Sequence, residues 1–329
     1  MKHANISIFV PHLGCPCKCS FCNQRYITGQ TSTPTERDVD TAVKVAMQSK
    51  NYDCNKTELA YFGGSFTAID REYMTNLLKW GKKHIDAGNI SGIRISTRPD
   101  CIDDRVLKIL KQYGVTAIEL GAQSMQDKVL KMNNRGHDAN AVIKASQLIK
   151  SNGFSLGLQM MTGLYGDNDE GAVFTAKEFI KLKPDTVRVY PTVVLKNTDL
   201  AALYRSGEYT PQTVEQAATL GAVLLKMFFD KGIDVIRFGL HTIDEDSFVA
   251  GPWHPALAEL AYSEIYYNIA VNKLSNKSKG DYVISVKSSD ISKMIGQKRS
   301  NILKLKALDY NCTVVPDDSI KQYDVDIKI

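Results

Sequence analysis

The sequence predicts an α/β fold, a partial (β/α)6 barrel followed by a small α+β unit. Short apolar or β-branched runs alternate six times with longer segments of helical spacing, which is typical of a parallel sheet with helices outside it. The pattern changes after about residue 240, so an open six-unit barrel fits better than a closed eight-unit one. We therefore expect a barrel over 1–240, a helical connection and linker over 241–279, and an α+β domain over 280–329.

The expected strands are short and rich in apolar and β-branched residues: Ile6–Val10, Glu58–Phe62, Gly92–Ser96, Ala117–Leu120, Ser155–Met160 and Thr186–Tyr190. The segments between them have helical spacing: Glu36–Gln48, Arg71–Ile85, Asp104–Tyr113, Ala139–Ser151 and Gly171–Leu182. A long helix over 211–231, a further strand candidate over 234–240 and a helix over 256–270 follow. In curled parallel sheets the carboxyl ends of the strands carry the site, so we expect function in the segments that follow the strands.

Composition and charge restrict the class of protein. The 329 residues are 43% hydrophobic and 23% charged, as in soluble globular proteins. We find neither a basic-then-apolar leader nor an apolar run of bilayer length, so we expect a cytoplasmic protein without a membrane partner. Residues 273–329 hold 11 Lys or Arg against 7 Asp or Glu, so most of the net charge of +5 lies where a polyanion would bind.

Four cysteines lie within eight residues: Cys15, Cys17, Cys19 and Cys22. The CxxxCxxC spacing of the first, third and fourth brings three thiolates around one 4Fe-4S cluster and leaves one iron open for a small molecule. A structural zinc site with all four thiolates is the alternative. Zinc sites more often draw two CxxC arms from separate segments, and the sequence has no second arm, so the cluster is favoured. Cys17 is taken as a spare ligand, although CxCxxC remains a possible spacing.

With Phe21 just before the last cysteine, this loop resembles the signature of radical SAM enzymes. The resemblance implies a [4Fe-4S] cluster whose open iron chelates S-adenosylmethionine, an aromatic residue beside the adenine, and an electron donor as partner. Reductive cleavage would then give a 5'-deoxyadenosyl radical. The turn formed by Gly63, Gly64 and Ser65 resembles the glycine pair whose backbone contacts the methionyl amine, although a glycine pair alone usually marks a tight turn.

Later segments resemble the radical SAM part of the Elongator catalytic subunit, and also oxygen-independent coproporphyrinogen oxidases. The resemblance implies that Gln123 and Arg135 reach polar groups of the cofactor, and it assigns contacts to Ser96, where a carboxylate is usual, and to Gln159 on the fifth strand. Arg98 and Glu119 are expected in an ion pair or as ligands. Segments 187–195 and 198–200 look most like Elongator, but no acetyltransferase domain is recognised, so acetyl transfer is not implied.

The terminal unit resembles a KH RNA-binding module, in which a GxxG loop between two helices contacts the nucleic-acid backbone. Here the loop reads Gly296-Gln297-Lys298-Arg299, so Lys298 and Arg299 are the predicted RNA contacts; a solvated basic turn is the other interpretation. We expect a radical SAM enzyme acting on RNA, with tRNA favoured. The alternatives are a radical SAM enzyme for a small molecule such as a tetrapyrrole, and a non-enzymatic zinc-containing RNA-binding protein.

Overall fold

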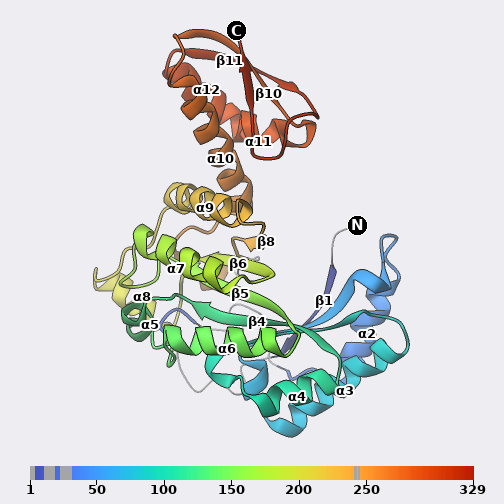
Figure 1. Ribbon diagram of the computed structural model, residues 1–329. Helices are drawn as coiled ribbons and strands as arrows, with labels where there is room; N and C mark the ends of the chain where they lie inside the picture. The colour runs from blue at the N-terminus through green and yellow to red at the C-terminus, as the bar shows by residue number, and fades with distance from the viewer. Residues whose placement is uncertain (1–3, 11–18, 23–31, 241–242, 244) are drawn as a thin grey trace.

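A curled parallel sheet forms the larger part of the computed structural model, which describes residues 4–10, 19–22, 32–240, 243 and 245–329. Its seven strands follow one another in chain order, except that β7 is left out, and every neighbouring pair is parallel. They are β1 (Ala4–Val10), β2 (Thr57–Gly63), β3 (Gly92–Thr97), β4 (Val115–Gln123), β5 (Ser155–Thr162), β6 (Thr186–Pro191) and β8 (Asp234–Phe238). The expected open barrel is confirmed, and the strand candidate after residue 233 extends the sheet by one strand (Figure 1).

Helices cover the outer face of this sheet (Figure 1). They are α2 (Glu36–Met47), α3 (Arg71–Asp86), α4 (Asp104–Gln112), α6 (Ala139–Ser151), α7 (Asp169–Leu182) and α9 (Val214–Phe229). Several begin at an Asp, Asn or Thr whose side chain accepts a hydrogen bond from an amide of the first turn, as Asp70 does for α3 and Asn168 for α7. These caps satisfy amides that have no partner within the helix, and they fix where each helix starts.

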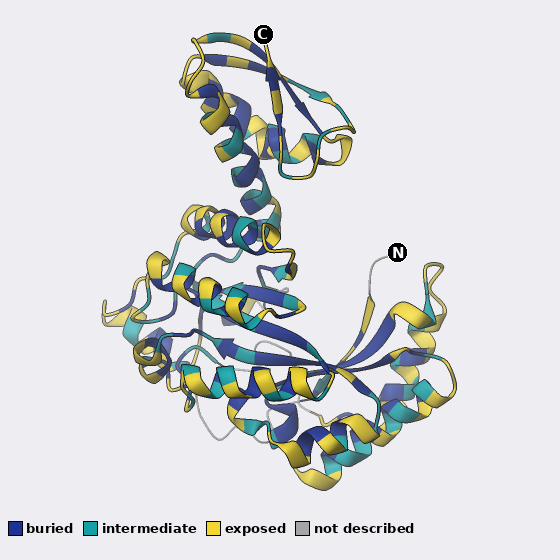
Figure 2. Ribbon diagram, viewed as in Figure 1, coloured by how far each residue is buried: buried dark blue, intermediate teal, exposed yellow. Residues whose placement is uncertain are grey.

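The strands alternate between an apolar outer face and a polar inner face. On β3, Ile93 and Ile95 are fully buried in the main hydrophobic core, and Arg94 and Ser96 point to the opposite side. Inner-face positions on β4 and β5 are likewise polar, with Glu119 and Gln159. Figure 2 shows the buried strands beneath helices whose outward faces are exposed. The outer face therefore stabilises the fold, and the inner face is available for chemistry.

Short elements near the carboxyl edge of the sheet were not expected from the sequence. They are α5 (Asp127–Met132), α8 (Asp199–Arg205) and the antiparallel pair β7 (Val194–Leu195) and β9 (Phe248–Ala250). Single 3-10 turns occur at Cys54–Lys56, Phe66–Ala68, Pro99–Cys101, Glu245–Ser247, Ser288–Asp290 and Gln297–Arg299. Among the described residues, no helix has both the length and the apolar character needed to cross a bilayer.

A small βααββ unit follows the helix α10 (Leu257–Leu274) (Figure 1). Its elements are β10 (Gly280–Val286), α11 (Ile291–Ile295), α12 (Ser300–Ala307), β11 (Tyr310–Pro316) and β12 (Asp326–Lys328). Strand β10 lies in the centre, parallel to β11 and antiparallel to β12. The unit has its own hydrophobic core, to which α10 contributes Tyr266, Ala270 and Leu274.

Tyr323 joins this unit to the barrel. Its ring contacts Phe229 of α9 edge-on, with 4.5 Å between the ring centroids, and it also lies against Tyr262 and Tyr266 of α10. Its amide donates to the Tyr266 hydroxyl over 2.8 Å, and that hydroxyl donates to the buried Asp290 over 2.6 Å. The joint therefore combines aromatic packing with a buried hydrogen-bond chain that leads to the start of α11.

Candidate active site

The described part of the cysteine loop, residues 19–22, lies at the carboxyl edge of the sheet. The Ser20 amide and hydroxyl both donate to Asn133, over 3.2 and 2.8 Å, and the Leu200 amide donates to the Ser20 carbonyl over 2.8 Å. Phe21 is half-buried against the apolar cluster formed by β7 and α8. The segment after α5 and the start of α8 thus hold the loop from two sides.

Arg135 contacts the first described cysteine. Its Nη1 donates to Cys19 Sγ over 3.2 Å, and its Nη2 donates to the Gly121 carbonyl at the end of β4. Both side chains are buried, with 6% of Arg135 and 7% of Cys19 exposed. The structure therefore places the predicted arginine against a predicted cluster ligand, a contact that the sequence did not predict.

The end of β4 contributes Gln123 in an unusual conformation. Its φ is +68°, in the left-handed region, where the register of β4 against β5 shifts by one residue. Such strain in a non-glycine residue costs about 1–3 kcal/mol and is characteristic of functional sites. A Cβ on Gly121 would approach Gln123 Nε2 to 3.1 Å and Arg135 Nη2 to 3.6 Å, so both side chains lie beside that glycine.

His137 lies behind Arg135. Its Nε2 faces the Ala122 carbonyl at 3.2 Å, which assigns the proton to that nitrogen and leaves a lone pair on Nδ1. Burial, and next the Arg135 charge, lower the pKa of His137 from 6.5 to about 4. The imidazole is therefore neutral at physiological pH, which keeps the positive charge of the site on Arg135.

The predicted glycine turn follows β2. Gly63 has a φ of +113°, and a Cβ there would collide with the Val10 carbonyl, so only glycine fits. The Ser65 hydroxyl is completely buried and lies 2.8 Å from Thr97 Oγ1, while it also accepts from the Arg98 amide over 3.2 Å. The backbone of Gly63 and Gly64, and not the Ser65 hydroxyl, is therefore the part of this turn available to a ligand.

Ser96 and Gln159 lie together on the inner face. Gln159 Nε2 donates to Glu119 Oε2 over 2.8 Å and to Ser96 Oγ over 3.4 Å. Both bonds use the amide nitrogen, and neither uses the acceptor Oε1. The predicted cofactor residues of β3 and β5 thus meet, although neither is a carboxylate.

A buried ion network centred on Glu119 holds the Gln159 side chain in place. Glu119 is 1% exposed and accepts from Arg188 Nε over 2.7 Å, from Arg188 Nη2 over 3.0 Å and from Arg94 Nη1 over 3.3 Å. Arg94 also donates to Glu58 over 2.8 Å. Glu119 thus forms an ion pair with Arg188. Arg98 forms a separate ion pair with Asp100. Glu58, Arg94 and Arg188 were not predicted as site residues. Each is the single charged residue of an otherwise uncharged strand, a signal that could have indicated them.

The residues present fit the cofactors of the expected enzyme class. Arg135 Nε, Gln123 Oε1 and His137 Nδ1 are buried and have no hydrogen-bond partner among the described residues, as expected where a polar ligand would complete the site. Within those residues no group of three His, Cys, Asp or Glu side chains is placed to hold a metal ion. Cys15 and Cys17 lie outside them, so the predicted ligand set is described only at Cys19 and Cys22.

The predicted RNA-binding loop precedes α12. Gly296 has φ +77° and ψ 160°, and a Cβ there would lie 2.5 Å from Ser300 Oγ, so glycine is required. Lys298 and Arg299 are exposed and both adopt the left-handed conformation, with φ of +52° and +62°. Arg299 occupies the position of the second glycine of the GxxG motif, and it adopts the left-handed backbone conformation that favours glycine there.

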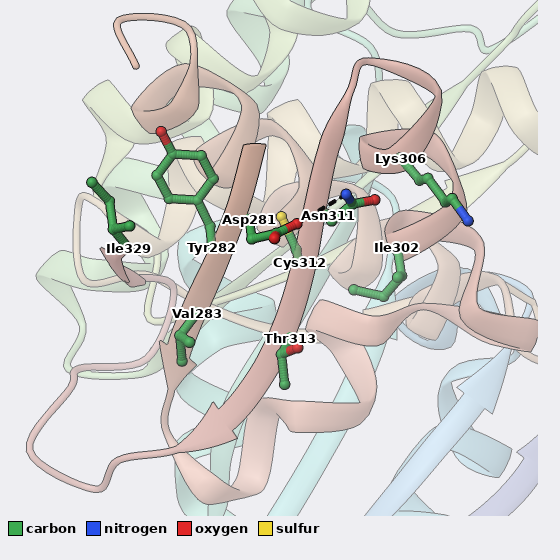
Figure 3. Close-up of a pocket in the computed structure, with 9 residues that line it drawn as sticks. All are labelled: Asp281, Tyr282, Val283, Ile302, Lys306, Asn311, Cys312, Thr313 and Ile329. Carbon is green, nitrogen blue, oxygen red and sulfur yellow. Dashed lines mark hydrogen bonds between the residues drawn. The ribbon is translucent and has the colours of Figure 1, made fainter. Parts of the chain in front are cut away.

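A cavity of about 430 Å³ lies in the same unit, along β10, β11 and α12 (Figure 3). Ile302 and Lys306 line it from α12, one helical turn apart, and Asn311 and Thr313 line it from β11. The Asn311 side chain donates to Asp281 over 2.9 Å across the strand pair. The same helix thus starts at the basic loop and borders a cavity with mixed apolar and polar walls.

Comparisons with known proteins agree with this arrangement. The family model described as Radical SAM superfamily matches residues 9–179, and that of the Radical_SAM C-terminal domain matches residues 184–267. The chain is 30% identical over 191 residues to a tRNA uridine(34) acetyltransferase of Methanocaldococcus jannaschii, covering 52% of this chain and 35% of the relative. It is 29% identical over 203 residues to human Elongator complex protein 3, covering 55% of this chain and 37% of that protein. The chain therefore spans less than half the length of these two relatives.

Two solved structures share the fold. Elp3 of Methanocaldococcus infernus with residues 1–46 deleted superposes with a TM-score of 0.65 at 21% identity, over 85% of this chain and 65% of that one. Coproporphyrinogen III oxidase of Escherichia coli superposes with a TM-score of 0.50 at 19% identity, over 70% of this chain and 54% of that one. At these identities the likeness establishes the fold.

Proposed function

We propose that this chain, which belongs to the radical SAM superfamily, abstracts hydrogen from an RNA, with tRNA as the favoured substrate. It is an enzyme of that class, with a [4Fe-4S] cluster and S-adenosylmethionine as cofactors. When bound, the reduced cluster supplies the electron that cleaves S-adenosylmethionine to methionine and a 5'-deoxyadenosyl radical. An electron donor is therefore a required partner, and a cytoplasmic location stays a prediction of the sequence.

Within this proposal each residue has a defined task. Cys15, Cys19 and Cys22 hold the cluster. The remaining residues orient S-adenosylmethionine; they are Phe21, Gly63, Gly64, Ser65 (through its backbone alone), Ser96, Gln123, Arg135 and Gln159. The unpartnered donor on Arg135 and acceptor on Gln123 support contacts with the charged methionyl end, and Gln159 Oε1 is suited to accept from a hydroxyl. The absence of a side chain at Gly63, where a Cβ would meet the Val10 carbonyl, supports a cofactor contact through the backbone of this turn.

The basic loop at Lys298 and Arg299 is the main support for an RNA substrate. Two exposed cations stand in a left-handed turn directly before α12, where unpaired helix amides also favour phosphate. The cavity beside Lys306 and Asn311 is large enough for a small planar group and offers polar atoms at its rim. Relatives named for tRNA modification and for Elongator support the same substrate class. We propose 1–240, 241–279 and 280–329 as the working divisions of the chain.

The first experiment tests the cluster ligands. Anaerobic reconstitution should give about four irons per chain, because three cysteines suffice for a cluster with one open iron. Cys15→Ala, Cys19→Ala and Cys22→Ala should each abolish loading, and Cys17→Ala should not. Full loading of Cys19→Ala would refute the ligand assignment. Stoichiometric zinc without iron would instead favour the zinc-containing RNA-binding protein.

The second experiment tests the RNA partner. Lys298→Ala combined with Arg299→Ala should weaken tRNA binding across sequences and reduce the slope of log affinity against log salt by about one to two units, because two phosphate contacts are lost. The matched control is Lys321→Ala with Lys328→Ala, which removes the same charge from exposed positions near β12. If both double variants behave like the parent chain, the loop is a solvated turn and the small-molecule substrate is favoured.

A further inference from the structure

The contact between Arg135 and Cys19 has no role in cofactor binding as described so far. The guanidinium divides its donors among three directions: Nη1 to Cys19 Sγ at 3.2 Å, Nη2 to the Gly121 carbonyl, and Nε toward no partner among the described residues. The Arg135 amide donates to the Leu130 carbonyl over 3.0 Å, which fixes the backbone after α5. The position of Nη1 beside the sulfur is therefore determined by two anchors outside the cysteine loop.

We propose that Arg135 tunes the reduction potential of the cluster by donating a charge-assisted hydrogen bond to the Cys19 thiolate sulfur. This role is separate from any contact that Nε makes with S-adenosylmethionine, and it rests on the proposed assignment of Cys19 as a cluster ligand. Arg135 is thus a positioning and tuning residue for electron transfer.

The electrostatics of the site favour this role. Reduction adds one negative charge, part of which resides on the thiolate sulfurs, so an N–H donor there stabilises the reduced state more than the oxidised state. Arginine keeps its charge throughout the accessible pH range. No carboxylate within the described ranges forms an ion pair with Arg135, and the neighbouring His137 is neutral, so neither neutralises nor duplicates the charge. The Arg135 guanidinium is also almost fully shielded from water, which strengthens its effect.

A redox titration of the reconstituted full chain without S-adenosylmethionine isolates this effect from cofactor binding. Arg135→Gln should shift the equilibrium toward the oxidised cluster about tenfold, which for one electron lowers the midpoint potential by about 59 mV. Arg135→Lys, which keeps the charge but not the planar fork, should lower it by less. A midpoint equal to that of the parent chain in Arg135→Gln would overturn the inference.

The matched control is Arg237→Gln, since Arg237 donates to the Gly239 and Leu240 carbonyls and contacts no cysteine or carboxylate among the described residues. Its midpoint should stay near that of the parent chain, and an equal shift in this control would show that bulk charge, not the Cys19 contact, is responsible. A parent chain that loads no cluster would refute the proposed ligands and this inference together. A loaded cluster that ignores Arg135→Gln would refute this inference alone.

A second measurement needs no variant, so it applies even where Arg135→Gln fails to load. The parent chain is labelled with ¹⁵N only at arginine, reconstituted, reduced and examined by pulsed electron paramagnetic resonance. A weak ¹⁵N coupling to the cluster spin is expected, because Nη1 lies one hydrogen bond from a ligand sulfur. Absence of this coupling would overturn the inference.

Discussion

Replacement of Glu119 by Gln should destabilise the protein strongly although the side-chain shape is kept. The carboxylate is 1% exposed and is bonded to Arg94, Arg188 and Gln159. Loss of its charge leaves two buried guanidinium groups with one carboxylate fewer, and breaking a buried pair from one side costs about 3–5 kcal/mol. The magnitude follows from the arginines that remain buried, and not from the number of hydrogen bonds lost.

Thermal unfolding of the cluster-free chain measures this cost. A cooperative unit of about 240 residues has an unfolding entropy of about 0.5 kcal/mol/K, so a loss of about 3–5 kcal/mol lowers Tm by about 6–10 °C. The control is Glu178→Gln, which removes a surface partner of Lys181 and should cost at most about 1 kcal/mol. If the two variants melt within 1–2 °C of each other, roughly the surface-pair range, the network is not a stabilising unit and the reasoning fails.

Three further outcomes follow from single features of the site and the terminal unit. The pKa of His137 is depressed to about 4 in the folded chain, so the unfolded state takes up the proton first as pH falls below 6.5. The free energy of unfolding should therefore decrease between pH 6.5 and pH 4, by about 3 kcal/mol in total. His137→Gln should show a shallower decrease of the urea midpoint over the same range. Arg299→Gly should raise the free energy of unfolding of the terminal unit by about 1 kcal/mol, because glycine adopts the left-handed conformation without strain; urea unfolding measures this, and an unchanged urea midpoint would contradict the strain. Asn133→Ala should speed maleimide labelling of Cys19 in the cluster-free chain, because Asn133 holds Ser20; equal labelling rates by mass spectrometry would refute that support.

Much of the fold follows from local pattern. Strand β3 was predictable because isoleucines and polar residues alternate along it, and α6 because its apolar spacing begins after the capping Asp138. The short helix α5 was missed because six residues carry too little periodicity. The helix α10 also ends four residues beyond its predicted end, where Leu274 is buried in the core of the terminal unit. Tertiary packing determined that boundary, not propensity.

The candidate site was predictable in its residues but not in its contacts. Resemblance identified Gln123 and Arg135. The contact of Arg135 with Cys19, however, joins segments 116 residues apart, and the left-handed turn at Gln123 lies where the register of β4 against β5 shifts. Ser65 shows the converse, because its hydroxyl is already bonded to Thr97 and only its backbone remains for a ligand. Sequence motifs identify the residue types of the site, and the tertiary contacts determine which of their atoms can still bind a ligand.

Tyr323 fixes the distance between the terminal unit and the barrel. Because its ring is fixed between Phe229 and the tyrosines of α10, and its amide is tied through Tyr266 to Asp290, the span from the basic loop to the carboxyl edge of the barrel is set within one chain. If an RNA docks its phosphates at Lys298 and Arg299, as proposed, its contour length would decide which nucleotides reach the radical. Such recognition by distance would need no base to be read at Lys298 and Arg299.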